Sequence, residues 1–457
     1  MSHFQGPDIN VALPHFQPNI SVLQILDESL RENGNTIALI ERETEKSITR
    51  AEILQQSRAV AAGLVDVGVT AGDYVILCSD KSIISYTILL GTMFTGATAV
   101  LAPTPRVQIS DIGLQLSGSN FRGKKTPRSL LITTPLFWYS AIPTFLSSIF
   151  NHCLLYLSDT KDVKENLQVI EKKKVTIWFT GAASMPSYVN EPSLKLYDLT
   201  TLKTVFVGGE IVLGSLFKEF ETKVLGGRIK LGTAYGSTEC GLITAAIQGV
   251  PEGDDRSGSC GKLIPGVEIK ILDDEGHLVS PGNIGEIWIK TLAVTPGYWG
   301  RPDLNSSMFD NDGFFRNGDA GYFDPEGNLY LRGRVCDLIN FRGHKFSPTE
   351  LEDSIISHPS VMDVAVVGKP HSCDIHHATA FVVRIPEYNV SEKEIMDFVN
   401  GKVDETMKLR GGVRFLDELP RTATGKVLRQ KLKEYASTDS FSEILTEHPS
   451  LVHNSTN

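Results

Sequence analysis

The stretch RGRVCDLINFRGHKFSPTELE, residues 332–352, separates two parts of the chain that differ in sequence pattern. Before it, residues 258–330 hold short β-rich runs separated by turn pairs such as Pro-Glu-Gly, a pattern typical of a small β subdomain. Within it, Ser347, Pro348 and Glu350 predict a capping box with proline at the first helical position. The residues that follow, up to residue 440, have the size and pattern of a separate α+β domain. We therefore predict a domain boundary within this stretch.

The chain ahead of the β-rich segment alternates helical patterns with short apolar runs. Residues 49–67 begin with a Thr49/Glu52 capping box and carry apolar residues at helical spacing, and residues 82–94 predict a second helix. Buried strands are predicted at residues 74–77, 99–101, 175–179 and 204–207. This alternation predicts a layered α/β domain over residues 1–334, with the β subdomain inside it. A C-terminal α+β domain over 335–440 and a flexible tail over 441–457 complete the predicted organisation.

Composition narrows the possible partners. A chain of 457 residues is too long for one compact core, and its net charge of −10 disfavours a nucleic-acid partner, because phosphate backbones select basic surfaces. The six cysteines lack the spacing of zinc ligands or redox dithiols. No signal peptide or membrane span is indicated, and the last residues read HNSTN rather than a peroxisomal Ser-Lys-Leu signal. We expect a cytoplasmic protein, without integral membrane association, that acts on a small molecule.

Four further blocks join residues 332–352 to form a recognisable series. They read AYGSTECG (234–241), GEIWIKTLAVTPGYW (285–299), FFRNGDAGYFD (314–324) and LPRTATGKVLRQ (419–430). In this order and spacing, the five blocks resemble the core motifs of the adenylate-forming superfamily, which includes acyl-CoA synthetases and luciferases. The resemblance covers about residues 20–435. It implies ATP-dependent activation of a carboxylic acid to an acyl-adenylate, with Mg²⁺, followed by transfer to coenzyme A.

The resemblance also implies roles for particular residues. The backbone of Gly208 and Gly209 would line the adenine pocket, with Tyr235 against the adenine face. Asp319 would accept hydrogen bonds from both ribose hydroxyls and Arg334 would contact the ribose. The residues implied in catalysis are Thr238 at the phosphate, Glu239 as the ligand of Mg²⁺, and Lys426, which neutralises charge during adenylation. Asn317 stands where the family usually has threonine, and a modest effect is expected because asparagine still forms hydrogen bonds.

The family's second half-reaction implies a rotation of the C-terminal domain. The hinge would fall at Cys336 or Asp337, and the loop around Gly343 would swing toward the thiol tunnel. The acyl pocket would be lined by Phe137, Trp138 and Gly232 and by residues near 180–183. Aromatic residues there fit an apolar carboxylic acid, although a buried core strand would hold the same residue types.

One family element is missing from the sequence. Members carry a Ser/Thr/Gly-rich loop ending in Pro-Lys-Gly that wraps the β- and γ-phosphates. Here only 32 positions separate Pro103 from Pro135, where the family spends on the order of 100 more. In one registration, residues 106–110 are the stub after the lost loop. In the other, residues 117–125 (SGSNFRGKK) are a degenerate loop with Lys124 as its lysine. The first is favoured, because the second lacks the central Thr-Gly.

Three functions are therefore compared. The leading one is an acyl-CoA ligase with impaired adenylation, and the second is a non-catalytic protein that binds AMP or an acyl-adenylate. A luciferase-like monooxygenase ranks last, because Asn340 stands where luciferases carry lysine. A cluster of residues in the C-terminal domain (His371, Cys373, His376 and His377) has no fixed metal-ligand spacing. It does not by itself predict a metal site.

Overall fold

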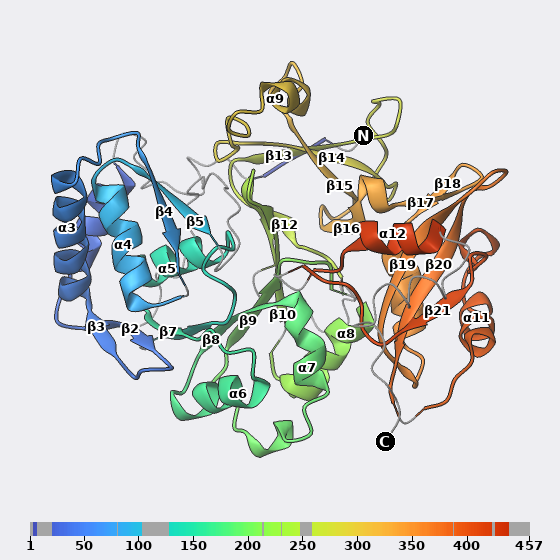
Figure 1. Ribbon diagram of the computed structural model, residues 1–457, viewed down its shortest axis with the longest axis horizontal. Coiled ribbons are helices and arrows are strands. Elements are labelled where there is room, and N and C mark those ends of the chain that lie inside the picture. The colour runs from blue at the N-terminus through green and yellow to red at the C-terminus, as the bar shows by residue number, and fades with distance from the viewer. Residues whose placement is uncertain are drawn as a thin grey trace.

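The computed structural model describes residues 3–6, 21–79, 81–102, 128–212, 214–229, 231–246, 258–386, 388–422 and 426–437. Both candidate remnants of the phosphate loop, residues 106–110 and 117–125, lie outside these ranges. The fold is a large α/β unit with a β subdomain, followed by an α+β unit at the C-terminus (Figure 1). The predicted fold class is therefore confirmed.

A nine-stranded sheet forms the centre of the large unit. Its order is β12-β11-β10-β9-β8-β6-β7-β2-β3, and every pairing from β10 to β2 is parallel. The bounds are β12 Lys262–Leu263, β11 Gly241–Ala245, β10 Leu231–Ser237, β9 Thr204–Gly208, β8 Ile177–Gly181, β6 Ser129–Ile132, β7 Leu154–Leu157, β2 Ile37–Glu41 and β3 Ser47–Thr49. A separate parallel pair joins β4 (Tyr74–Cys78) to β5 (Thr98–Ala102). The helices are α2 Val22–Arg31, α3 Arg50–Asp66, α4 Ile83–Phe94, α5 Ala141–Phe150, α6 Val163–Lys172, α7 Met185–Val189 and α8 Gly214–Glu219.

Alternation along the buried strands explains why helices cover both faces of this sheet. Leu130 and Ile132 pack into one hydrophobic core, and Leu131 between them packs into the other. Successive side chains of a strand point to opposite faces, so an entirely apolar strand must be covered twice. The Thr49/Glu52 capping box of α3 is present as predicted.

A buried lysine ties the strand ends together. The Lys81 ammonium is fully buried and donates to the carbonyl oxygens of Ile132 (3.0 Å), Thr134 (2.9 Å) and Ser158 (2.7 Å). Asp159 lies 3.4 Å away. Burial lowers the pKa of Lys81 to about 8, and Asp159 opposes that shift. The lysine therefore fixes the segment after β6, which forms part of the site described below.

The β subdomain is an antiparallel sheet of order β1-β13-β14-β15-β16. Its strands are β1 His3–Gln5, β13 Val267–Leu272, β14 Gly285–Thr291, β15 Phe315–Phe323 and β16 Leu329–Arg334, with α9 at Pro302–Met308 between β14 and β15. The short β1 comes from the start of the chain, so this layer is not made only from the β-rich segment that the sequence marked out.

The C-terminal α+β unit contains a sheet of order β18-β17-β20-β19, with β21 parallel to β20. Its elements are β17 Ile339–Phe341, β18 His344–Phe346, α10 Pro348–Ile356, β19 Val361–His371, β20 Ile375–Arg384, α11 Glu392–Asn400, β21 Val413–Leu416 and α12 Arg429–Ser437. Figure 1 shows it beside β16 and α8 of the large unit.

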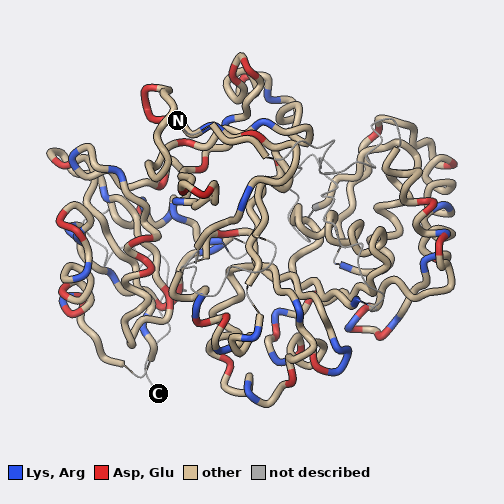
Figure 2. The backbone as a smooth tube through the Cα atoms, turned by 180° about the vertical axis from the view of Figure 1, so that it is seen from behind, with Lys and Arg blue, Asp and Glu red and all other residues tan. Residues whose placement is uncertain are grey.

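Figure 2 shows Lys and Arg interspersed with Asp and Glu along the described chain. Within the described ranges, no helix is both long and apolar enough to cross a membrane.

The predicted capping box at the start of α10 is wrong in one respect. Ser347 does cap the helix, but its hydroxyl accepts from the Thr349 backbone N–H and donates to the Arg332 carbonyl (2.6 Å). Glu350 does not complete a capping box, and its carboxylate lies 3.4 Å from Arg332. The tertiary ion pair replaces the local hydrogen bond that the box would have supplied.

Candidate functional site

A cleft of about 2000 Å³ lies where the C-terminal ends of the parallel strands meet the β subdomain and the C-terminal segment. Ligands of α/β proteins commonly bind at this edge of a sheet. The residues singled out by sequence that line it are Phe137, Trp138, Gly208, Gly209, Tyr235, Thr238, Glu239, Asp319, Arg334, Asp337 and Lys426. Three others, Gly232, Cys336 and Gly343, are not part of its wall. The fold thus brings together residues separated by almost 300 positions in the sequence.

A hydrogen-bonded cluster around Asp319 forms one side of the cleft. The Tyr235 hydroxyl donates to Asp319 Oδ2 (2.6 Å), and Asn317 Nδ2 donates to the same oxygen (2.5 Å) and to the Tyr235 hydroxyl (2.6 Å). Arg334 Nε lies 3.1 Å from Asp319 Oδ1, and its guanidinium also donates to the Asn317 carbonyl (2.8 Å). Asn317 therefore organises this cluster rather than merely replacing a threonine.

Strand register explains why these groups meet. β15 pairs with β16 so that Asp319 stands directly opposite Arg334. Tyr235 comes from β10 of the other sheet and reaches Asp319 across the boundary between the two sheets. Opposite charges at directly paired positions attract each other and so stabilise the pairing of β15 with β16.

Burial sets the electrostatics of the cluster. Burial raises the pKa of the Asp319 carboxyl, whereas Arg334 and the Tyr235 hydroxyl act to lower it. Burial, followed by the Asp319 charge, raises the pKa of the Tyr235 phenol well above its ordinary value. The tyrosine therefore stays a hydrogen-bond donor at neutral pH.

Another part of the cleft wall is glycine backbone that lies close to the Trp138 ring. Gly209 has a φ of +97°, and a Cβ built on it would lie 2.6 Å from the Trp138 ring. A Cβ on Gly181 would lie 3.6 Å from the same ring. Gly232 lies behind the wall, since its Cβ would meet the Phe206 ring at 2.7 Å, and Phe206 itself lines the cleft. Gly209 and Gly232 are required because the aromatic rings approach their backbone too closely for a Cβ, whereas a Cβ on Gly181 would make an ordinary contact.

The turn between β10 and β11 presents Thr238 and Glu239. Ser237 pairs with Gly241 across the turn, and the Ser237 hydroxyl accepts from the Cys240 N–H (3.1 Å). The Tyr298 hydroxyl donates to Glu239 Oε1 at 2.6 Å, and the Thr295 N–H donates to the Glu239 carbonyl at 2.7 Å. The carboxylate is thereby held in a fixed place in the cleft wall.

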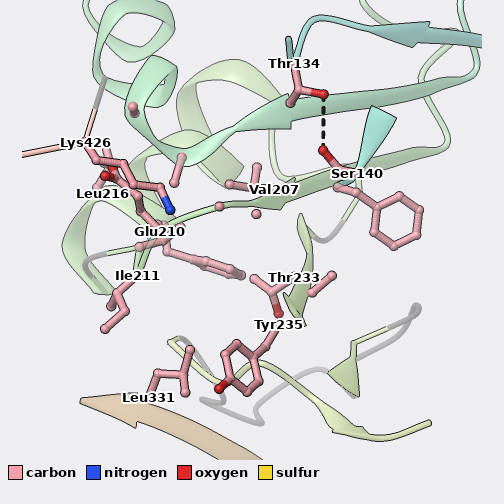
Figure 3. Close-up of a pocket in the computed structure, with 18 of the residues that line it drawn as sticks. Thr134, Ser140, Val207, Glu210, Ile211, Leu216, Thr233, Tyr235, Leu331 and Lys426 are labelled. Atoms are coloured by element: carbon pink, nitrogen blue, oxygen red, sulfur yellow. Dashed lines mark hydrogen bonds between the residues drawn. The ribbon is translucent and has the colours of Figure 1, made fainter. Parts of the chain in front are cut away.

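Lys426 enters the cleft from the C-terminal segment, and Tyr235 lies across the pocket from it (Figure 3). The Lys426 ammonium lies 6.0 Å from the Trp138 ring centroid. Its charge acts to lower the pKa values of Asp319 and Glu210. The segment is positioned by the Thr422 N–H, which donates to the Lys426 carbonyl (2.7 Å).

Glu210 is a cleft residue that the sequence did not single out. Burial raises the pKa of its carboxyl, opposed by Lys426, Arg421 and Arg429. The available signal was a carboxylate directly after the Gly208-Gly209 turn, at the end of a buried strand. Acidic side chains at that edge of a parallel sheet are candidates for a site.

The predicted hinge is a single turn of 3-10 helix at Val335–Asp337. Lys433 in α12 donates to the Cys336 carbonyl (2.8 Å) and to the Asp337 carboxylate (2.7 Å). Gly343 lies in the β17–β18 turn with a φ of +90° and open space around its Cβ position. It is away from the cleft in this arrangement, whereas Lys426 is inside it.

Two family models match the chain. The family model described as AMP-binding enzyme matches residues 26–105 and 108–299, and the model of the AMP-binding enzyme C-terminal domain matches residues 350–426. The first match is interrupted at residues 106–107, inside the segment where the sequence lacks the phosphate loop.

Individual relatives are similar over only part of their length. The chain is 33% identical over 306 residues to a probable 4-coumarate–CoA ligase 2 from Dictyostelium discoideum, covering 66% of this chain and 54% of that protein. It is 34% identical to luciferin 4-monooxygenase from Nipponoluciola cruciata, covering 53% of this chain and 43% of that protein. The chain thus spans about half the length of these curated relatives. The solved structure of ATP-bound MatB from Rhodopseudomonas palustris superposes with a TM-score of 0.79 at 21% identity, covering 91% of this chain and 99% of that one.

Proposed function

We propose that this chain, which belongs to the AMP-binding enzyme family, binds AMP and acyl-adenylates in its cleft and transfers the acyl group to coenzyme A, but forms the adenylate from ATP slowly. One observation carries the proposal. Asp319, held by Tyr235, Asn317 and Arg334, lies in the same cleft as Lys426 of the C-terminal segment. A fixed carboxylate suits ribose hydroxyls, and a mobile cation suits an α-phosphate.

Adenylate formation requires positioned charges and hydrogen-bond donors rather than a general base. A carboxylic acid is already ionised at neutral pH, since its pKa is near 4. Attack on the α-phosphate brings two anions together, so positive charge and oriented donors stabilise the transition state. Lys426 is the cation in position, and the Thr238 hydroxyl in the cleft wall is the donor. Glu239, already oriented by Tyr298, fits a Mg²⁺ ion that binds through one carboxylate and the nucleotide phosphates.

The acid is proposed to be apolar and aromatic. Phe137, Trp138, Phe179 and Phe206 line the cleft, and the Phe179 and Phe206 rings stack at 5.9 Å. Aromatic walls of this kind take up flat apolar groups. The name of the 4-coumarate–CoA ligase relative makes aromatic acids the first class to test.

Slow adenylation is proposed because the cradle for the outer phosphates is missing from the sequence between Pro103 and Pro135. The interruption of the family match at residues 106–107 supports the registration that places the loss there. The same observation favours a second candidate, a protein that binds AMP or acyl-adenylates without turnover. A luciferase-like reaction stays last, given Asn340.

A thermal-shift series tests the nucleotide part of the proposal. AMP and a non-hydrolysable acyl-adenylate analogue should raise the melting temperature more than ATP does at equal concentration, because stabilisation follows occupancy of the folded state. Equal or greater stabilisation by ATP would contradict it. Acyl-CoA formation from a supplied aromatic acyl-adenylate separates the two candidates, since the binding protein would form none.

A further inference from the structure

The turn between β19 and β20 gathers two imidazoles around one carboxylate. His377 Nε2 lies 2.8 Å from Asp374 Oδ2, and His371 Nδ1 lies 3.5 Å from the same oxygen. One ligand atom from each residue falls within 4.8 Å of the other two. Within the part of the chain that the structure describes, this is the one place where three such ligand atoms come together.

The hairpin register produces this arrangement. His371 pairs with Ile375, and His377 pairs with Lys369, so the two histidines are diagonal neighbours on one face of the hairpin. Their rings stack at 3.8 Å between centroids. Asp374 occupies the turn itself, just before Ile375, whose φ of +70° lies in the left-handed region. Neither Cys373 nor His376, which the sequence grouped with these histidines, belongs to the triad.

We propose that His371, Asp374 and His377 form a binding site for a transition-metal ion of the zinc class. Two imidazole nitrogens and one carboxylate oxygen are the donors that Zn²⁺ prefers, and a water molecule would fill the fourth position. With bonds of about 2.0–2.1 Å, tetrahedral ligand atoms stand about 3.3 Å apart. Asp374 Oδ2 lies 3.5 Å from His371 Nδ1 and 2.8 Å from His377 Nε2, on either side of that value. The His371 side chain is 38% exposed, so water can reach the ion's fourth position, and metal binding would replace the hydrogen bonds that His371 Nδ1 now accepts from the Cys373 and Asp374 N–H groups.

An outer group already orients the carboxylate. Arg342 Nε lies 2.6 Å from Asp374 Oδ1, so that oxygen is engaged and Oδ2 faces the histidines. The Arg342 backbone N–H also donates to the Asp374 carbonyl (3.1 Å). Outer hydrogen bonds of this kind fix ligating carboxylates in metal sites. The triad does not line the nucleotide cleft, so its test is independent of the proposed function.

The alternative is a hydrogen-bonded clasp that holds the turn without an ion. In that case His371 Nδ1 serves only as the acceptor for the Cys373 and Asp374 N–H groups, at 3.3 and 3.2 Å. A clasp would stabilise the hairpin but would not take up Zn²⁺ selectively. The two readings differ in metal stoichiometry, which can be measured directly.

The experiment uses the full chain without an affinity tag, stripped with a chelator and titrated with Zn²⁺ by calorimetry. We expect one Zn²⁺ site, with Mg²⁺ failing to compete. His371→Ala and His377→Ala should each weaken it by at least about 10²-fold, because loss of even an outer partner costs about 10–100-fold. Circular dichroism checks that each variant is folded, and tetrahedral Co²⁺ absorption gives a second readout.

His277→Ala is the matched control. His277 is an exposed histidine 3.7 Å from Asp273 in another turn, so it repeats the His–Asp pair without a second imidazole. Its loss should leave Zn²⁺ binding unchanged, as should Cys373→Ser. Unchanged binding in both triad variants would overturn the proposal, and so would loss of the site in Cys373→Ser alone.

Discussion

Replacing Asp319 with asparagine should weaken AMP binding about tenfold. A hydrogen bond to a charged acceptor contributes about 1.5–3 kcal/mol, and each 1.4 kcal/mol is about a factor of ten in Kd. A carboxylate offers about four acceptor positions, and Tyr235, Asn317 and Arg334 already take three of them. About one acceptor position is left for the ribose, rather than the two that the family resemblance implies, and this places the expected loss near the lower end of the range. Isothermal titration with AMP measures it.

The matched control is Glu286→Gln. Glu286 forms an ion pair with Arg316 (2.8 Å) in the same sheet but does not line the cleft, so its loss should leave AMP affinity unchanged. Because the pKa of Asp319 is raised, AMP affinity of the wild-type chain should also fall in mild acid, as the carboxylate gains a proton. A folded Asp319→Asn variant with wild-type affinity would refute the ribose assignment.

Three further perturbations follow from the same structure. Lys426→Ala should reduce any residual pyrophosphate exchange by at least about tenfold, yet leave thioester formation from a supplied acyl-adenylate within about twofold, since the lysine acts on the adenylation transition state; equal loss of both would indicate misfolding. Glu210→Gln should raise the melting temperature at neutral pH. The pKa of Glu210 is raised because burial disfavours its charged carboxylate, so the folded state is destabilised only where that group is ionised. The gain in melting temperature should therefore vanish as the pH falls through the raised pKa to below about 4.5. A gain that is the same at every pH would contradict this reasoning. Lys81→Met should lower the free energy of unfolding, measured in urea, by about 3 kcal/mol. Three carbonyls lose their donor at about 1–3 kcal/mol each, and the removal of a buried charge offsets part of this loss. An unchanged urea midpoint would contradict the stabilising role of Lys81.

Local sequence patterns predicted most of the elements because their signals are local. The cap and spacing of residues 49–67 are complete within one helix, and α3 follows them closely. The α10 capping box failed because Glu350 has a tertiary partner, Arg332, that lies outside any local window. Lys81 stands just before Ser82, the cap of α4, and nothing local shows that its ammonium will be buried under three carbonyls.

In the candidate sites too, local motifs identify some residues, whereas the contacts between them depend on the fold. Asp319 and Arg334 could be named from motifs, but their direct pairing depends on the β15–β16 register. The acidic member of the histidine cluster was missed for a related reason. Asp374 joins His371 and His377 only through the diagonal register of the β19–β20 hairpin, which spacing alone does not fix.

The central claim is that the chain keeps an adenylate site but lacks the loop that handles the outer phosphates of ATP. Measuring both half-reactions side by side tests it most directly, in this chain and in a version with the Ser/Thr/Gly-rich loop restored. Pyrophosphate exchange into ATP should be at least about 10²-fold slower in this chain, since loss of one preorganised donor typically costs about 10²–10³ in rate. Acyl transfer from a supplied adenylate to coenzyme A should be similar in the two. Comparable exchange rates in both proteins, each shown to be folded, would contradict the account.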